Sequence, residues 1–166
     1  MLPFQDGSLV VESATGNVVK ATGEDWANHE VLMNIPGAFF LDCDDNNVYI
    51  SHAGTILQIV ASGVILEELI VVSSGYAAPE GIALVDDNTI LVVAAGSGTL
   101  EQVDLETGQT SVIGTELDFL SALPFFRLPF GFSNDVAVYD GSAFVNSDGA
   151  NAIYKFDLSP PTASPT

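Results

Sequence analysis

Short apolar runs separated by turn residues recur along the chain. The run at 82–85, Ile-Ala-Leu-Val, is apolar at every position, and an Asp-Asp-Asn turn precedes the next apolar run at 90–93. Asp, Asn and Gly suit tight hairpins because they tolerate left-handed backbone conformations. Val, Ile and Thr are frequent in the runs, and turn signals come roughly every 8–12 residues, which favours strands over helices. The pattern predicts an all-β chain of short antiparallel strands.

The strands also repeat as a larger unit. Three apolar segments that end on aspartate each begin a unit, at 36–42, 80–86 and 134–140. The interval from Asp42 to Asp86 is 44 residues, whereas that from Asp86 to Asp140 is 54, because an insertion falls within it. A partial copy, which lacks the innermost strand, precedes them. Four-stranded units of about 40–45 residues are typical of β-propeller blades.

Burial explains why such units would stack. A single four-stranded blade cannot bury both of its faces, but blades around a common axis cover one another, so their strands can be apolar on every residue. A β-sandwich also has many short strands but needs no internal repeat. The sequence therefore predicts a β-propeller of four-stranded antiparallel blades over residues 1–158. The expected blades lie at about 6–34, 35–75, 76–117 and 131–158, with an insertion at 118–130 and a Pro/Ser/Thr-rich tail at 159–166.

This count gives three and a half to four blades, at or below the usual range of about 4–8 in closed propellers. Open blades would leave apolar faces exposed. Three arrangements remain: a portion of a longer chain, closure by self-association, and a four-bladed ring. We favour the first.

Charge excludes several classes of partner. The 166 residues include 22 Asp and Glu against 3 Lys and Arg, so the net charge is −19. Nucleic-acid binding needs cations that neutralise phosphates, and an anionic membrane would repel this chain. The longest apolar region, at 56–72, is interrupted by polar residues and falls short of the roughly 18 that a membrane helix needs. We expect an acidic globular protein whose partner is a small molecule or a protein.

The third unit resembles the blade consensus of NHL-type propellers. It is also similar to the senescence-marker-protein–gluconolactonase-like (strictosidine-synthase-related) propellers, which the stretch at 134–154 resembles in particular. The segments that carry the likeness to both groups are Pro79-Glu80-Gly81-Ile82-Ala83, Leu91-Val92-Val93-Ala94, Gly96-Ser97-Gly98 and Val103-Asp104-Leu105-Glu106-Thr107-Gly108. The resemblance covers 36–158 and implies the propeller fold. These groups include lactonases, esterase-like enzymes and non-catalytic binding modules, so it does not fix an activity.

The resemblance also implies a place for a metal ion. Lactonases of this group hold one divalent cation on the axis, through oxygens at the entrances of innermost strands. The repeats place Pro36, Glu80 and Asn134 at this position, and a carboxylate with an amide suits Ca²⁺ or another hard divalent cation. Glu80 and Asn134 are therefore the candidate metal ligands, while Pro36 has no ligating side chain. The alternative is that both residues cap backbone N–H groups near the axis.

The insertion carries five Phe within 119–132. Its prolines, Pro124 and Pro129, exclude a regular helix or a central strand. It could form a lid or wall at the axial mouth, or a partner-docking patch, and the alternative is a plug that fills the channel. The candidate ligand- or partner-contacting residues are Phe125, Phe126, Arg127 and Phe130.

Other chemistry has little support. The chain has no G-x-S-x-G, P-loop or G-x-G-x-x-G motif, and His29 and His52 are too few and too far apart for a zinc site. Hairpin formation accounts for the turn acids, which are Asp42, Asp44, Asp45, Asp86, Asp87 and Asp140.

The sequence therefore predicts a β-propeller binding or scaffold module that presents an axial mouth to a small molecule or protein. One alternative is a divalent-metal-dependent hydrolase, lactonase or esterase-like, of the same family. The second alternative is an extracellular structural or adhesive module. The tail at 159–166 is its one cue and hints at an extracellular or periplasmic setting, although no signal peptide is visible.

Overall fold

The computed structural model describes residues 2–4, 7–23, 27–44, 47–62, 65–119 and 134–158. These residues form fifteen strands. Among them we find no helix that is long and apolar enough to cross a bilayer. The strands are β1 (Leu2–Phe4), β2 (Gly7–Glu12), β3 (Asn17–Thr22), β4 (Asn28–Asn34), β5 (Ala38–Cys43), β6 (Asn47–His52), β7 (Thr55–Ser62), β8 (Ile65–Ser74), β9 (Pro79–Asp86), β10 (Thr89–Ala94), β11 (Thr99–Asp104), β12 (Thr110–Gly114), β13 (Val136–Tyr139), β14 (Ser142–Ser147) and β15 (Ala152–Asp157).

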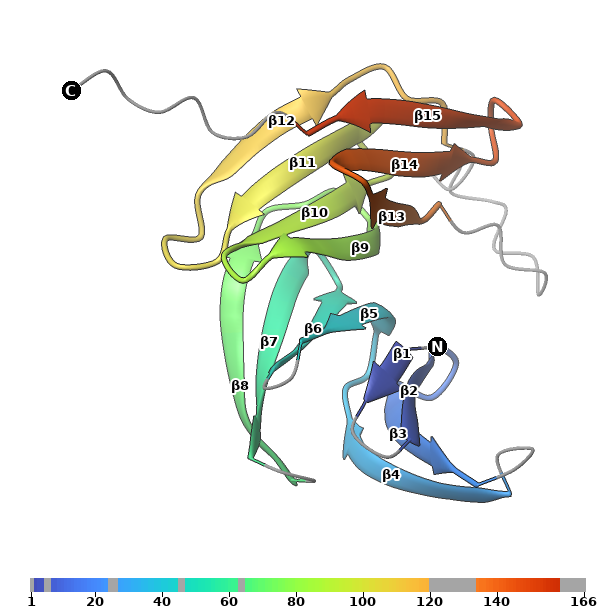
Figure 1. Ribbon diagram of the computed structural model, residues 1–166, viewed down its shortest axis with the longest axis vertical. Coiled ribbons are helices and arrows are strands. Elements are labelled where there is room, and N and C mark those ends of the chain that lie inside the picture. The colour runs from blue at the N-terminus through green and yellow to red at the C-terminus, as the bar shows by residue number, and fades with distance from the viewer. Residues whose placement is uncertain are drawn as a thin grey trace.

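Consecutive strands pair into four antiparallel sheets, which we call blades one to four. Blade one contains β1–β4, blade two β5–β8, blade three β9–β12 and blade four β13–β15, and within each blade the strand order follows the chain. The blades lie in an arc, with β1, β5, β9 and β13 nearest its centre (Figure 1). The predicted fold class, an all-β propeller of antiparallel blades, is confirmed.

The expectation that blade one lacks its innermost strand is wrong. Residues Leu2–Phe4 form β1 and pair with β2, with Leu2 opposite Leu9 and Phe4 opposite Gly7. A strand of three residues is too short to show the alternation or apolar run by which the longer strands were recognised. Blade one is therefore four-stranded, and blade four has three strands among the described residues.

Face-to-face packing of the blades buries the core. Three apolar clusters join neighbouring blades: the first contains Leu9 and Ile50, the second Ile56 and Val92, and the third Leu100 and Val145. In β10, Ile90 and Val92 belong to the cluster shared with blade two, while Leu91 and Val93 belong to the cluster shared with blade four. Because both faces of β10 are covered, this strand is apolar on consecutive residues.

The hairpin turns follow the sequence signals. Asp140 and Gly141 have φ angles of 47° and 68° and connect β13 to β14, where Tyr139 pairs with Ser142. Two left-handed residues between paired strands are the requirement of a tight type I′ hairpin, which explains the Asp-Gly pair.

Candidate functional site

A cavity of about 490 Å³ lies where the inner strands of the four blades converge. Its lining comes from β2, β5, β9 and β13, together with Asp135 just before β13, so every blade contributes. The volume lies within the range of roughly 300–1,000 Å³ that small-molecule pockets occupy. The lining segments are 9–11, 39–42, 82–84 and 135–138. Their side chains are apolar apart from two carboxylates, those of Asp42 and Asp135. We call this cavity the axial pocket.

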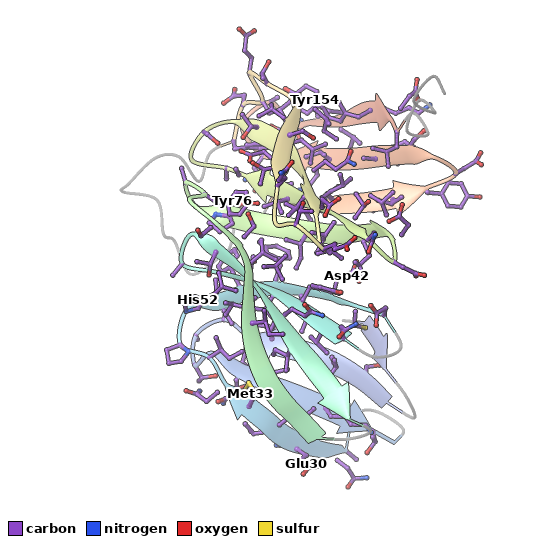
Figure 2. The ribbon with its side chains drawn as sticks, turned by 90° about the vertical axis from the view of Figure 1, so that its left-hand side faces the viewer. Glu30, Met33, Asp42, His52, Tyr76 and Tyr154 are labelled. Atoms are coloured by element: carbon purple, nitrogen blue, oxygen red, sulfur yellow. The ribbon has the colours of Figure 1, made fainter. Side chains whose placement is uncertain are left out.

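Asp42 joins two blades at the axial pocket. Its carboxylate accepts hydrogen bonds from the N–H of Leu84 on β9, at 2.7 Å, and from the N–H of Cys43, at 2.9 Å. Asp42 lies at the junction of blades two and three (Figure 2). Burial raises the pKa of the Asp42 carboxyl, although the two N–H donors act to lower it.

The assignment of Asp42 to a hairpin turn is wrong. Asp42 is within β5 and bonds to the next blade, whereas the turn after β5 uses Asp44, whose Oδ1 accepts the N–H of Asn47 at 2.8 Å. The repeat placed Asp42 beside Asp44 and Asp45 in an acidic run, and the sequence did not distinguish their roles.

Asp135 is the second carboxylate of the axial pocket. Asn146 fixes its backbone, because Oδ1 of Asn146 accepts the N–H of Asp135 at 2.6 Å, and Oδ1 of Asp135 accepts the N–H of Val136 at 2.8 Å. Asp135 stays exposed on one side, while partial burial of its carboxyl raises its pKa and the negative charge of Asp42 raises that pKa further. Neither aspartate forms a salt bridge to another described residue. The pocket therefore holds two interacting acidic groups among apolar walls.

Sequence reasoning missed this pair. Asp135 occupies the repeat position of Gly37 and Gly81, so a comparison of the units by residue type would have marked it as an exception. A Cβ on Gly81 would meet the Cα of Asp135 at 2.5 Å, so only glycine lets β9 approach so closely.

Glu80 and Asn134, the expected metal ligands, lie in direct contact. Glu80 Oε2 accepts hydrogen bonds from the backbone N–H of Asn134 at 2.9 Å and from its Nδ2 at 2.8 Å. Asn134 Oδ1 accepts the N–H of Asp148 at 3.1 Å, and the carbonyl of Asn134 accepts the N–H of Gly81 at 2.9 Å. Both side chains are buried. These bonds join the start of β9 to the segment that leads into β13.

The contacts of this pair match the capping alternative. Ca²⁺ takes about 6–8 oxygen ligands, and the two oxygens named here already accept N–H donors. Within the described ranges, no group of three or more His, Cys, Asp or Glu side chains is arranged to hold a metal ion. These contacts do not test metal binding at Glu80 and Asn134, which stays a prediction.

The remaining candidates lie elsewhere. His52 is half-buried at the end of β6, and its Nε2 lies 2.9 Å from the carbonyl of Pro36, so it contacts the segment that precedes β5. His29 is exposed on β4. The tail at 159–166 and four candidate contact residues lie outside the described residues: Phe125, Phe126, Arg127 and Phe130.

Comparison with known proteins bears on the fold. No family model and no curated protein matches the chain. A chain of the nidogen–laminin complex is similar over 85% of this chain and 53% of that one, at 16% identity and a TM-score of 0.62. A chain of the S. cerevisiae complex of Dbp5 with Nup159, Gle1, IP6 and ADP is similar over 98% of this chain and 46% of that one, at 16% identity and a TM-score of 0.50.

The chain thus spans about half the length of the solved structures it resembles. At this identity the likeness supports a β-propeller fold in general, and not the senescence-marker-protein–gluconolactonase group in particular. The chain has the fold of a β-propeller, with an apolar, acid-containing pocket at its axis.

Proposed function

We propose that this chain is a binding module whose axial pocket takes a small molecule with an apolar body and a positively charged group, such as an amine. The observation that carries the proposal is the placement of Asp42 and Asp135 in one pocket whose other side chains are apolar.

The two kinds of lining set the ligand class. Apolar walls such as Phe39, Phe40 and Ile82 favour an apolar body, because burial contributes about 25 cal/mol per Å² of apolar surface. A cation near Asp42 and Asp135 would offset their mutual repulsion and stabilise their ionised forms. The net charge of −19 would also attract cations toward the molecule and repel anions.

Calorimetric titration with phenylbutylamine, phenylbutanol and phenylbutyrate tests this proposal. We expect the amine to bind, the alcohol to bind at least about tenfold more weakly, and the carboxylate not to bind, because the three share one apolar body. Burial raises the pKa of both aspartates, so both become protonated at a higher pH than ordinary aspartates do. As the pH is lowered, the affinity for the amine should therefore begin to fall above the usual aspartate range.

Matched variants locate the binding. Asp135→Asn should weaken amine binding and leave binding of the alcohol nearly unchanged. Asp140→Asn removes an exposed carboxylate from a hairpin turn, at a left-handed position that Asn tolerates, and should leave both affinities unchanged. Equal binding of amine and carboxylate, or equal effects of Asp135→Asn and Asp140→Asn, would reject the proposal.

A protein partner is a second candidate ligand for the same module. The two solved structures named above are complexes of proteins, nidogen with laminin and Dbp5 with Nup159 and Gle1. A basic peptide side chain with an apolar stem would meet the same chemistry in the axial pocket, because Lys combines a methylene stem with an ammonium group.

A further inference from the structure

Two consecutive phenylalanines on β5 form one corner of the axial pocket. The ring centroids of Phe39 and Phe40 are 5.2 Å apart and the ring planes are at 62°, which is an edge-to-face arrangement. Both residues line the pocket, and Phe39 is 41% exposed, so part of its ring is accessible to a ligand. We call this pair the aromatic corner, because its two rings meet at a steep angle.

An irregularity in β5 brings the two rings together. Neighbouring side chains of a regular strand point to opposite faces of its sheet, which would separate consecutive phenylalanines. Between Ala38 and Leu41, however, the two phenylalanines are opposite a single residue of β6, Ser51, so β5 has a bulge here. The hydroxyl of the buried Ser51 accepts the N–H of Phe40 at 3.0 Å. Bulges redirect side chains, and this one allows both rings to line one pocket.

The aromatic side chains are particular to blade two, although the bulge is not. The inner strand of blade three, β9, has a register shift at the corresponding point, between Pro79 and Ile82. The two residues that it contains are Glu80 and Gly81, neither of which is aromatic. The blade architecture therefore does not require two rings at this point, and we treat the aromatic corner as a property of the pocket.

The pocket offers few hydrogen-bond acceptors to a cation. Among its described lining residues, only Asp42 and Asp135 have polar side chains. The two oxygens of Asp42 already accept the N–H groups of Cys43 and Leu84, and Oδ1 of Asp135 accepts that of Val136. A primary ammonium is strongly hydrated and has three N–H donors, so it would lose water here without gaining a full set of acceptors. A cation without N–H groups does not have this cost.

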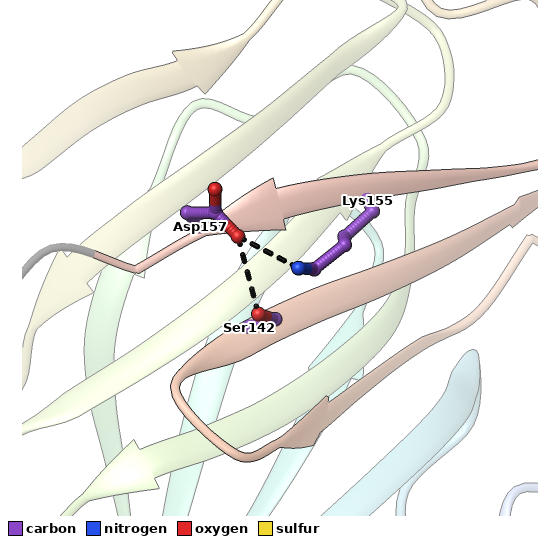
Figure 3. Close-up of polar contacts among 3 residues, drawn as sticks. All are labelled: Ser142, Lys155 and Asp157. Carbon is purple, nitrogen blue, oxygen red and sulfur yellow. Dashed lines mark hydrogen bonds and ion pairs between the residues drawn. The ribbon is translucent and has the colours of Figure 1, made fainter.

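The carboxylates of the pocket also differ from one that has a cationic partner. On β15, the carboxylate of Asp157 lies 3.0 Å from the ammonium of Lys155 and accepts the hydroxyl of Ser142 at 3.3 Å (Figure 3). Asp42 and Asp135 have no such ion pair with another described residue, in a chain that has three Lys and Arg in total. A cationic ligand would supply the missing positive charge.

We propose that the axial pocket takes a small molecule with a quaternary ammonium group, such as a trimethylammonium, seated against the aromatic corner. This inference rests on the proposed function and narrows its ligand class. The methyl groups of a trimethylammonium can meet an apolar wall without the loss of a hydrogen bond. Its charge is attracted to the faces of aromatic rings within about 6 Å, and the carboxylates of Asp42 and Asp135 add a longer-range attraction.

Calorimetric titration of the complete chain with phenylbutyltrimethylammonium and phenylbutylamine tests this inference. The two probes share one apolar body, and both carry one positive charge near neutral pH. We expect the trimethylammonium probe to bind at least about fivefold more tightly than the amine. Equal binding of the two probes, or tighter binding of the amine, would overturn the inference and leave the proposed function standing. Failure of both probes to bind would overturn both.

Substitutions at Phe39 separate the effect of the ring from that of its apolar surface. Phe39→Leu keeps an apolar side chain but removes the ring. It should weaken binding of the trimethylammonium probe at least about fivefold and change the affinity for phenylbutanol by less than about twofold. Phe39→Tyr keeps the ring at a partly exposed position and should bind the trimethylammonium probe as the unchanged chain does.

Tyr139→Leu is the matched control, since Tyr139 is 74% exposed and does not line the axial pocket. This variant should bind every probe as the unchanged chain does, and thermal unfolding should show that all three variants fold. Equal losses in Phe39→Leu and Tyr139→Leu would overturn the inference. A loss in Phe39→Leu that is equally large for phenylbutanol would also overturn it, because the ring would then act through its apolar surface alone.

Discussion

Replacing Glu80 with alanine is expected to lower the free energy of unfolding by about 3 kcal/mol. The substitution removes the acceptor of two donors, the backbone N–H and the Nδ2 of Asn134, both on a fully buried residue. A buried donor left without a partner costs about 1–3 kcal/mol, and here two donors lose theirs. Urea unfolding of the variant and of the unchanged chain measures the difference.

Two controls separate the role of this contact from a general effect of lost charge. Glu106→Ala removes an exposed turn carboxylate and should change stability by less than about 0.5 kcal/mol. Added Ca²⁺ should not stabilise the unchanged chain if Glu80 is a cap alone. A loss below about 1 kcal/mol in Glu80→Ala would contradict the account. Stabilisation by Ca²⁺ that is lost in the variant would favour the metal-dependent hydrolase.

Leu100→Ala is expected to destabilise the chain by about 3 kcal/mol, whereas Ile153→Ala should change stability by less than about 0.5 kcal/mol in dilute protein. The two residues have equivalent places in successive blades, but Leu100 is fully buried against blade four and Ile153 is 72% exposed. The large-to-small change leaves a cavity only where a neighbouring blade covers the side chain. Urea unfolding at a concentration that keeps the chain single measures both effects.

Equal losses in the two variants would show that blade four is covered on both faces within a single chain. A small loss in Leu100→Ala would show that blades three and four do not pack through this cluster. Either result would contradict the arrangement of the blades described here.

The fold was predictable because its determinant is repeated. The run at 90–93 is apolar at every position, which indicates a strand buried on both faces. Because such runs recur with turn signals between them, the sequence also indicates that neighbouring units of the repeat bury those faces. β1 escaped prediction because three residues cannot display a period. The repeat thus predicts the strands that recur at full length, but it does not predict the short strand β1 of blade one.

The candidate site was predictable only in part, because side-chain direction decides it. The alignment of repeats placed Glu80 and Asn134 at equivalent positions, and the two do meet. It did not indicate that the amide nitrogen of Asn134, and not its oxygen, faces the carboxylate. Asp42 and Asp135 are far apart in the chain, and their shared pocket depends on how β5 and β13 converge, which no local pattern records.

Methyl NOEs in the isotope-labelled chain, measured in dilute protein, test the stacking of blades in sequence most directly. The account predicts contacts between methyl groups of blades three and four, in the cluster of Leu100 and Val145, and between blades one and two, in the cluster of Leu9 and Ile50. It predicts none between methyl groups of blades one and three outside the axial pocket, which both blades line. A network that joins blade one to blade three across a common layer would indicate two stacked sheets and would contradict the propeller.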